Sequence, residues 1–175
     1  IFTRNFELPG FGSKKGGNPN FGLYIAEFDG SIWTNIRELD ELNDRNYHTT
    51  HPTLSPMGDI LYFASDRPGG FGGYDIYVSY QQNGIWTKPE NLGPVVNTAE
   101  NEIYPNLHTS GRLYFSSNGH DRVGGYDIFF TDIFNNKWFK PVKLSSPFNS
   151  GLNDFTFYTD ENYEKSYKTN DIKNK

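Results

Sequence analysis

The chain has 175 residues, no cysteine and a formal net charge of −5. Its Lys and Arg residues are dispersed, which argues against the clustered basic surface that phosphate binding needs, so no nucleic-acid partner is expected. The lack of cysteine excludes a disulfide framework and a thiolate metal site, and no apolar run reaches the roughly 18 residues of a membrane span.

Aromatic residues supply most of the apolar side chains. Phe, Tyr and Trp make up 17% of the chain, while 18 Gly and 10 Pro are spread along its whole length at turn-like intervals. This composition favours many short strands joined by turns, with rings packed between sheets. The sequence therefore predicts an all-β protein.

An internal repeat of about 52 residues organises the chain. The segment Leu61 to Val78 aligns without gaps on Leu113 to Phe130, with 9 identities in 18 positions. Single residues recur at nearly the same spacing, namely Trp33, Trp86, Trp138, Asn43, Asn97 and Asn149. Fixed self-similarity of this kind is typical of a repeat architecture.

Each unit is expected to hold four antiparallel strands in the same order. In the second unit these are an extended stretch at 51–54, an aromatic strand beginning at Leu61, a strand at 74–78 after a Gly-rich loop, and a strand around Trp86. The predicted units are 1–46 (partial), 47–98, 99–150 and 151–175 (partial).

Four antiparallel strands repeated at this period are typical of β-propeller blades, whose sheets bury both faces against their neighbours. The fold class expected is an incomplete propeller, with two full blades and two partial ones. Closed propellers have about four or more blades. The ring is therefore expected to be completed by sequence outside this chain.

The repeated motif resembles a known family. The pattern that runs from Ser55-Pro56 through LYFASDRPGG to the Asp-Ile-Tyr at 75–77, followed by Trp86, Asn-Leu-Gly at 91–93 and Asn101-Glu102, is similar to the WD40-like repeat called PD40. The likeness is greatest to envelope proteins that also carry an OmpA-like peptidoglycan-binding domain in bacteria with type IX secretion and gliding. The resemblance implies a periplasmic, outer-membrane-associated propeller that binds another outer-membrane or periplasmic protein.

A candidate binding rim follows from the loops. The loops between the second and third strands are expected to share one rim with the connectors between units, and rigid scaffolds display binding residues on such loops. The residues predicted to bind there are Arg67, Phe71, His120, Arg122, Glu100 and Glu102. Asp75 and Asp127 open the third strands, where a structural role as acceptors of loop N–H groups is favoured over calcium binding.

No catalytic residue, metal or cofactor is predicted. His48 and His51 form an HxxH pair, but residues three apart in an extended segment point to opposite faces. The first-strand residues expected to line a central channel are Thr53, Ser55, Asn106 and His108, and they include no acidic pair for hydrolysis.

The function expected is therefore a non-enzymatic interaction scaffold of the cell envelope, linked to peptidoglycan by a neighbouring domain. Two alternatives stay open. One is a propeller that binds glycans or peptides, for which exposed Tyr and Trp on the rim would be the sign. The other is a propeller hydrolase with its active site in blades outside the chain.

Overall fold

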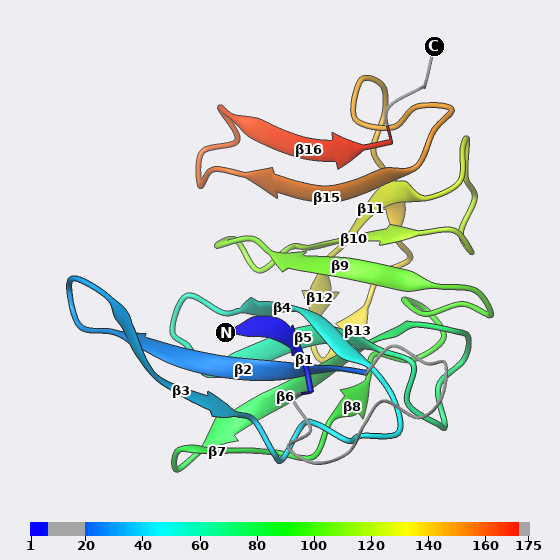
Figure 1. Cartoon of the computed structure of the whole chain (residues 1–175). Coiled ribbons are helices and arrows are strands. Elements are labelled where there is room, and N and C mark those ends of the chain that lie inside the picture. Colours follow the sequence, from blue (N-terminus) through cyan, green and yellow to red (C-terminus); the bar gives the residue numbers. More distant parts are fainter. Residues whose placement is uncertain (7–19, 172–175) are drawn as a thin grey trace.

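The computed structural model describes residues 1–6 and 20–171, and this part of the chain is entirely β, without a helix (Figure 1). All strand pairs in it are antiparallel. The strands are β1 (Phe2–Asn5), β2 (Phe21–Phe28), β3 (Trp33–Glu38), β4 (Thr49–Leu54), β5 (Ile60–Ser65), β6 (Asp75–Gln82), β7 (Ile85–Trp86), β8 (Glu90–Asn91), β9 (Glu102–Leu107), β10 (Leu113–Ser117), β11 (Asp127–Thr131), β12 (Ile133–Phe134), β13 (Lys137–Trp138), β14 (Val142–Lys143), β15 (Asp154–Thr159) and β16 (Ser166–Asn170).

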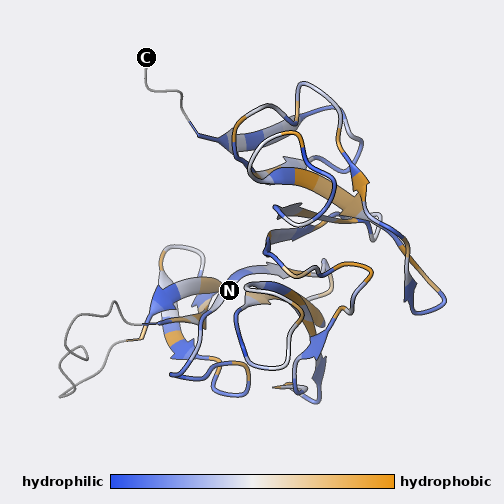
Figure 2. Cartoon of the chain, turned by 90° about the vertical axis from the view of Figure 1, so that its right-hand side faces the viewer, coloured by the Kyte–Doolittle hydropathy of each residue, from blue (hydrophilic) through white to orange (hydrophobic). Residues whose placement is uncertain are grey.

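Four sheets follow one another along the chain. The first sheet is β1-β2-β3, the second is β4-β5-β6-β7 with β8 also on β6, the third is β9-β10-β11-β14, and the fourth is the pair β15-β16. The short hairpin β12-β13 forms a further two-stranded sheet. Figure 2 shows the N-terminus and the C-terminus in two different lobes of the chain. The expectation of an all-β fold is confirmed, while a propeller ring remains a prediction.

The aromatic strands are buried on both faces. Leu61 and Phe63 are 0% exposed and the intervening Tyr62 is 6% exposed. Successive side chains of a strand point to opposite faces, so a strand with no exposed face must lie between two other layers. Phe63 belongs to the core on one side of the second sheet and Tyr62 to the core on the other.

Three apolar cores therefore separate the four sheets. The first core joins residues of β2 to residues of β5 and β6, the next joins the second sheet to the third, and the last joins the third sheet to Phe157 of β15. The buried members are Leu23, Leu39, Leu42, Leu61, Phe63, Tyr77 and Trp86; then Tyr62, Ile76, Val78, Leu92, Val96, Leu113, Phe115 and Phe129; then Tyr114, Ile128 and Phe157.

The repeated tryptophans do not share one environment. Trp86 is 5% exposed within the first core, and Trp138 packs against the second. Trp33 is 67% exposed and contacts Phe28 of its own sheet, with ring centroids 5.1 Å apart. Packing between sheets, which the repeat predicts for all three, thus holds for two of them within the described chain.

The fourth strand of the second unit is split into two short pieces. β7, which carries Trp86, pairs with Gln81 and Gln82 at the end of β6, and β8 pairs with Tyr77 and Val78 near its beginning. Pro89 lies between the two pieces and has no backbone N–H, so it cannot continue the ladder of hydrogen bonds. In the third unit, β14 pairs with β11 and Trp138 lies in a separate hairpin.

The repeated asparagines each hold one strand by hydrogen bonds to its backbone, and the strands are β2, β6 and β11. Each side chain accepts from the N–H and donates to the C=O of one residue on that strand, so its amide replaces a neighbouring strand at that point. The three braces join Asn43 to Leu23 (2.8 and 2.9 Å), Asn97 to Ile76 (2.8 and 3.0 Å) and Asn149 to Ile128 (2.7 and 2.8 Å).

Candidate functional site

The Gly-rich loops are organised by the aspartates that follow them. Asp75 accepts hydrogen bonds from the backbone N–H of Phe71 (2.5 Å) and Gly72 (3.2 Å) and from the side chain of Asn91 (2.8 Å). Asp127 accepts from the backbone N–H of Val123 in the equivalent loop. Both carboxylates are buried, at 1% and 0% exposed. Both accept backbone N–H groups of their own loops, and Asp75 also accepts from Asn91 of β8.

Three cationic or imidazole side chains latch each sheet to the connector before it. Each donates a hydrogen bond to the backbone carbonyl of the residue that precedes a repeated asparagine. The pairs are Arg67 Nη2 with Leu42 O (3.0 Å), His120 Nε2 with Val96 O (2.8 Å) and Lys168 Nζ with Phe148 O (2.9 Å). We call these three contacts the inter-sheet latches.

Two predicted rim residues, Arg67 and His120, are half-buried at the latches. The Arg67 guanidinium lies 5.1 Å from the ring centroid of Phe63 and 4.8 Å from that of Tyr77, and burial lowers the pKa of this group. His120 packs in the same way, with its ring centroid 5.2 Å from that of Phe129. These side chains hold sheets together, and a further role in binding a partner stays a prediction for them.

Glu102, also predicted on the rim, is fully buried. Its carboxylate accepts hydrogen bonds from Thr98 N (2.7 Å), Thr98 Oγ1 (2.8 Å) and Ser117 Oγ (2.6 Å), and none of its surface is exposed. The equivalent Asp154 is also 0% exposed and lies 2.5 Å from Lys168 Nζ. Both carboxylates fix the start of the next sheet, because they accept N–H groups from the connector before it.

Burial raises the pKa of Glu102, so its ionisation weakens the fold. Its folded pKa lies above its ordinary value of 4.5, and the free energy of unfolding is therefore expected to fall as pH rises from about 4.5 through the folded pKa. Glu102→Gln should flatten this part of the profile of stability against pH, measured by urea unfolding between pH 4.5 and 8. An unchanged profile would contradict this role of Glu102.

The other rim residues are exposed. Phe71 is 49% exposed, and Glu100 and Arg122 also lie at the surface. Phe71 and Glu100 lie on adjoining loops, because Gly73 N donates to Glu100 O (2.6 Å). Arg122 belongs to the loop of the third sheet. The rim as a binding surface stays a prediction for these three residues.

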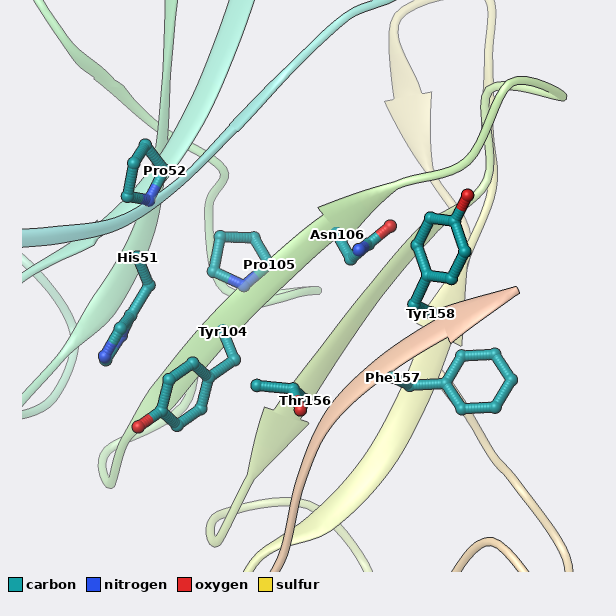
Figure 3. A pocket seen from close by; sticks show the side chains of 8 residues that line it. All are labelled: His51, Pro52, Tyr104, Pro105, Asn106, Thr156, Phe157 and Tyr158. Carbon is teal, nitrogen blue, oxygen red and sulfur yellow. The ribbon is translucent and has the colours of Figure 1, made fainter. Parts of the chain in front are cut away.

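A groove lies where the first strands β4, β9 and β15 run beside one another (Figure 3). It has a volume of about 190 Å³ and is lined by His51, Pro52, Tyr104, Pro105, Asn106, Thr156, Phe157 and Tyr158. We call it the first-strand groove. Of the residues predicted to line a channel, Asn106 lines this groove. Thr53 does not line it and accepts a hydrogen bond from Leu107 N (3.1 Å).

Each first strand is irregular at the groove. The pairing register shifts between Thr50 and Thr53 of β4 and between Phe155 and Phe157 of β15. For β9 the shift lies opposite Tyr114 to Ser116 of its partner strand β10. Two lining residues, His51 (φ 52°) and Tyr104 (φ 51°), have left-handed backbone conformations that cost non-glycine residues about 1–2 kcal/mol each. Bulges re-aim side chains. Here they aim an imidazole and a phenol ring side by side, with centroids 3.8 Å apart.

His51 is uncharged in the groove at neutral pH. Burial lowers the pKa of His51 to about 4, and its Nδ1 is buried without a hydrogen-bond partner. His48 lies elsewhere, with its Nδ1 accepting from Phe21 N (3.1 Å) and its ring 6.1 Å from that of Tyr74. The two histidines therefore do not share a site. Within residues 1–6 and 20–171, no three His, Asp or Glu side chains gather as metal ligands do.

Because the pKa of His51 is lowered in the fold, the free energy of unfolding is expected to decrease in acid. A histidine whose folded pKa lies below its ordinary 6.5 stabilises the fold above that pH, and this contribution is lost as pH falls from 6.5 to about 4. The expected loss is on the order of 2 kcal/mol. In His51→Asn, which tolerates the left-handed φ, the free energy of unfolding should change less over this range. An equally steep loss in the variant would contradict the prediction.

Comparisons with known proteins add no family. Neither a scan against protein-family models nor a search of curated proteins finds a match. In the described part of the chain, no helix is long and apolar enough to cross a membrane. The resemblance to PD40 repeats thus remains a prediction from the repeated motif.

Proposed function

We propose that this chain is part of a β-propeller that acts as a non-enzymatic protein-interaction scaffold in the bacterial cell envelope. The observation that supports the ring is the recurrence of one inter-sheet contact. Each of the three interfaces combines an apolar core, an asparagine brace and a latch on the carbonyl before that asparagine. A junction repeated in the same form adds sheets in one direction, as a propeller requires.

The same junctions support a scaffold role. They leave little freedom between sheets, so exposed loop residues such as Phe71 and Arg122 keep fixed positions on a rigid frame. The first-strand groove offers tyrosine, proline and asparagine side chains, which suit binding. Following the resemblance, we propose an outer-membrane or periplasmic protein as partner and a neighbouring domain as the link to peptidoglycan.

Capture of partners from envelope extracts tests the scaffold. The full-length polypeptide should retain a specific envelope protein, and Phe71→Ala combined with Arg122→Ala should weaken that capture. Phe134→Ala removes another exposed ring, 66% exposed, from the hairpin β12-β13 and serves as the matched control. Turnover of a peptide or polysaccharide without any captured protein would overturn the proposal.

Imaging tests the ring itself. Electron microscopy of the full-length polypeptide should show sheets arranged around a central axis, with the first strands innermost. A straight row of sheets would contradict the propeller and leave the interaction role to be judged from the capture experiment alone.

A further inference from the structure

The first-strand groove continues into a second hollow. A hollow of about 360 Å³ lies farther along β9 and β15 and shares Asn106 and Tyr158 with the first. Its other lining residues are Leu107, His108, Thr109, Thr159, Asp160 and Glu161. Together the two hollows form one elongated site that crosses the junction between the third and fourth sheets. An elongated site suits a chain-like ligand.

The two ends of this site differ in charge. The end near His51 holds only neutral groups, since burial lowers the pKa of that imidazole to about 4. The far end carries Asp160 and the exposed Glu161. His108, which lies between them and the neutral end, already uses both ring nitrogens, on Ser110 Oγ (2.8 Å) and Asp160 O (3.0 Å). A complementary ligand is therefore apolar at one end and basic at the other.

The first strands are protected against pairing with another strand. Pro52 and Pro105 lie on β4 and β9 and have no backbone N–H to offer. Neighbouring N–H groups are capped by threonine hydroxyls, from His51 N to Thr3 Oγ1 (3.2 Å) and from Leu107 N to Thr53 Oγ1 (3.1 Å). A peptide cannot easily bind here as an added β-strand. It must be recognised by side chains.

The neutral end has the chemistry that recognises polyproline II helices. Proline-rich segments dock into grooves lined by aromatic rings, and they arrive already extended, at low entropic cost. Figure 3 shows Pro52 and Pro105 side by side, with the Asn106 amide and the Tyr158 ring at the other end of the groove. Tyr158 is 55% exposed and can stack on a ligand. A sugar would instead require a dense set of polar partners for its hydroxyl groups, whereas most of this lining is apolar.

We propose that the elongated site binds a proline-rich segment of the partner in the polyproline II conformation, with Lys or Arg beside Asp160 and Glu161. This inference rests on the proposed interaction function and names the chemistry of the segment that is bound. The tyrosines and prolines hold the segment, and the acidic end sets its direction.

Titration of the full-length polypeptide with synthetic peptides tests this proposal. One probe has eight prolines followed by two arginines, and a second ends in two glutamates. The basic probe should bind and the acidic probe should bind at least tenfold more weakly, a difference that salt should reduce. Tyr158→Ala should weaken the basic probe roughly tenfold, and Glu161→Gln should reduce its preference over the acidic one. Phe134→Ala, outside the site, should bind as wild type does.

Chitotetraose serves as a competing probe. If it binds at this site, with loss in Tyr158→Ala, and the peptides do not, the proline-rich ligand is wrong and the site is a sugar site. If neither probe binds while the full-length protein still captures an envelope partner through Phe71 and Arg122, the groove proposal fails and the scaffold function stands. Failure of both experiments overturns both proposals.

Discussion

Gly72→Ala is expected to lower the free energy of unfolding by about 3 kcal/mol. A Cβ at position 72 would lie 2.2 Å from the carbonyl oxygen of Glu100 and 2.6 Å from that of Thr98. Both are backbone atoms of the connector, which cannot move aside as a flexible side chain can. The neighbouring Gly73 N donates to the same Glu100 oxygen (2.6 Å), so the loop and the connector must approach closely. The alanine would force the second and third sheets apart.

Thermal unfolding with matched controls isolates this effect. For a chain of this size, a loss of 3 kcal/mol should lower Tm by roughly 10 °C. Gly124→Ala should behave similarly, because a Cβ there would lie 2.2 Å from Leu152 O. At Gly151 a Cβ meets nothing within 4 Å, so Gly151→Ala should be neutral or slightly stabilising. If Gly72→Ala matches Gly151→Ala, the close approach does not govern this junction.

The repeat predicted the strands well because its strongest signals are packing constraints. Identical residues such as Tyr62 and Tyr114 recur where both faces of a sheet are buried, and Gly-Gly recurs where the next connector approaches. Asn97 and Asn149 recur because each braces one buried peptide group. In each case the contact constrains a single residue type, so the sequence repeats it and the element can be predicted.

The latches could not be predicted in the same way. Arg67, His120 and Lys168 do the same work with three different side chains, which come from two loops and from β16. A backbone carbonyl accepts from any N–H donor that reaches it. The contact therefore requires a side chain of sufficient length with an N–H group, and does not require one residue type. Arg67, His120 and Glu102 were predicted on a binding rim because they lie in loops and connectors, which rigid scaffolds use to display binding residues. The full burial of Glu102 and the partial burial of Arg67 and His120 become evident only when the next sheet is in place.

The groove was missed because it depends on irregular backbone. His51-Pro52 and Tyr104-Pro105 repeat at an offset of 53, which was a usable signal for a shared role of the two positions. Regular alternation, however, predicts neither the register shifts nor the left-handed φ of His51 and Tyr104. Their side chains therefore point where a regular strand would not place them.

Asn97→Ala is expected to lower the free energy of unfolding by about 3 kcal/mol. Asn97 is 1% exposed and makes hydrogen bonds of 2.8 Å with Ile76 N, 3.0 Å with Ile76 O and 2.8 Å with Asn91 Oδ1. Alanine would leave the buried N–H of Ile76 without a partner, at a cost of about 1–3 kcal/mol, and would leave Ile76 O with only its bond from Leu92 N (3.1 Å). Water cannot easily replace the amide, because Ile76 is fully buried in the core between the second and third sheets.

Two further variants separate the brace from general loss of packing. Asn97→Asp keeps the acceptor for Ile76 N but brings a buried carboxylate to Ile76 O, so it should destabilise the fold at neutral pH and recover in acid, where the protonated group can donate. Asn46→Ala removes an exposed amide whose hydrogen bond within the described residues is to Asp44 (2.7 Å), and it should change stability by less than about 0.5 kcal/mol. Urea unfolding of all three gives the comparison. Equal stability of Asn97→Ala and Asn46→Ala would show that β6 does not need the brace, and the repetition of this asparagine would then require another cause.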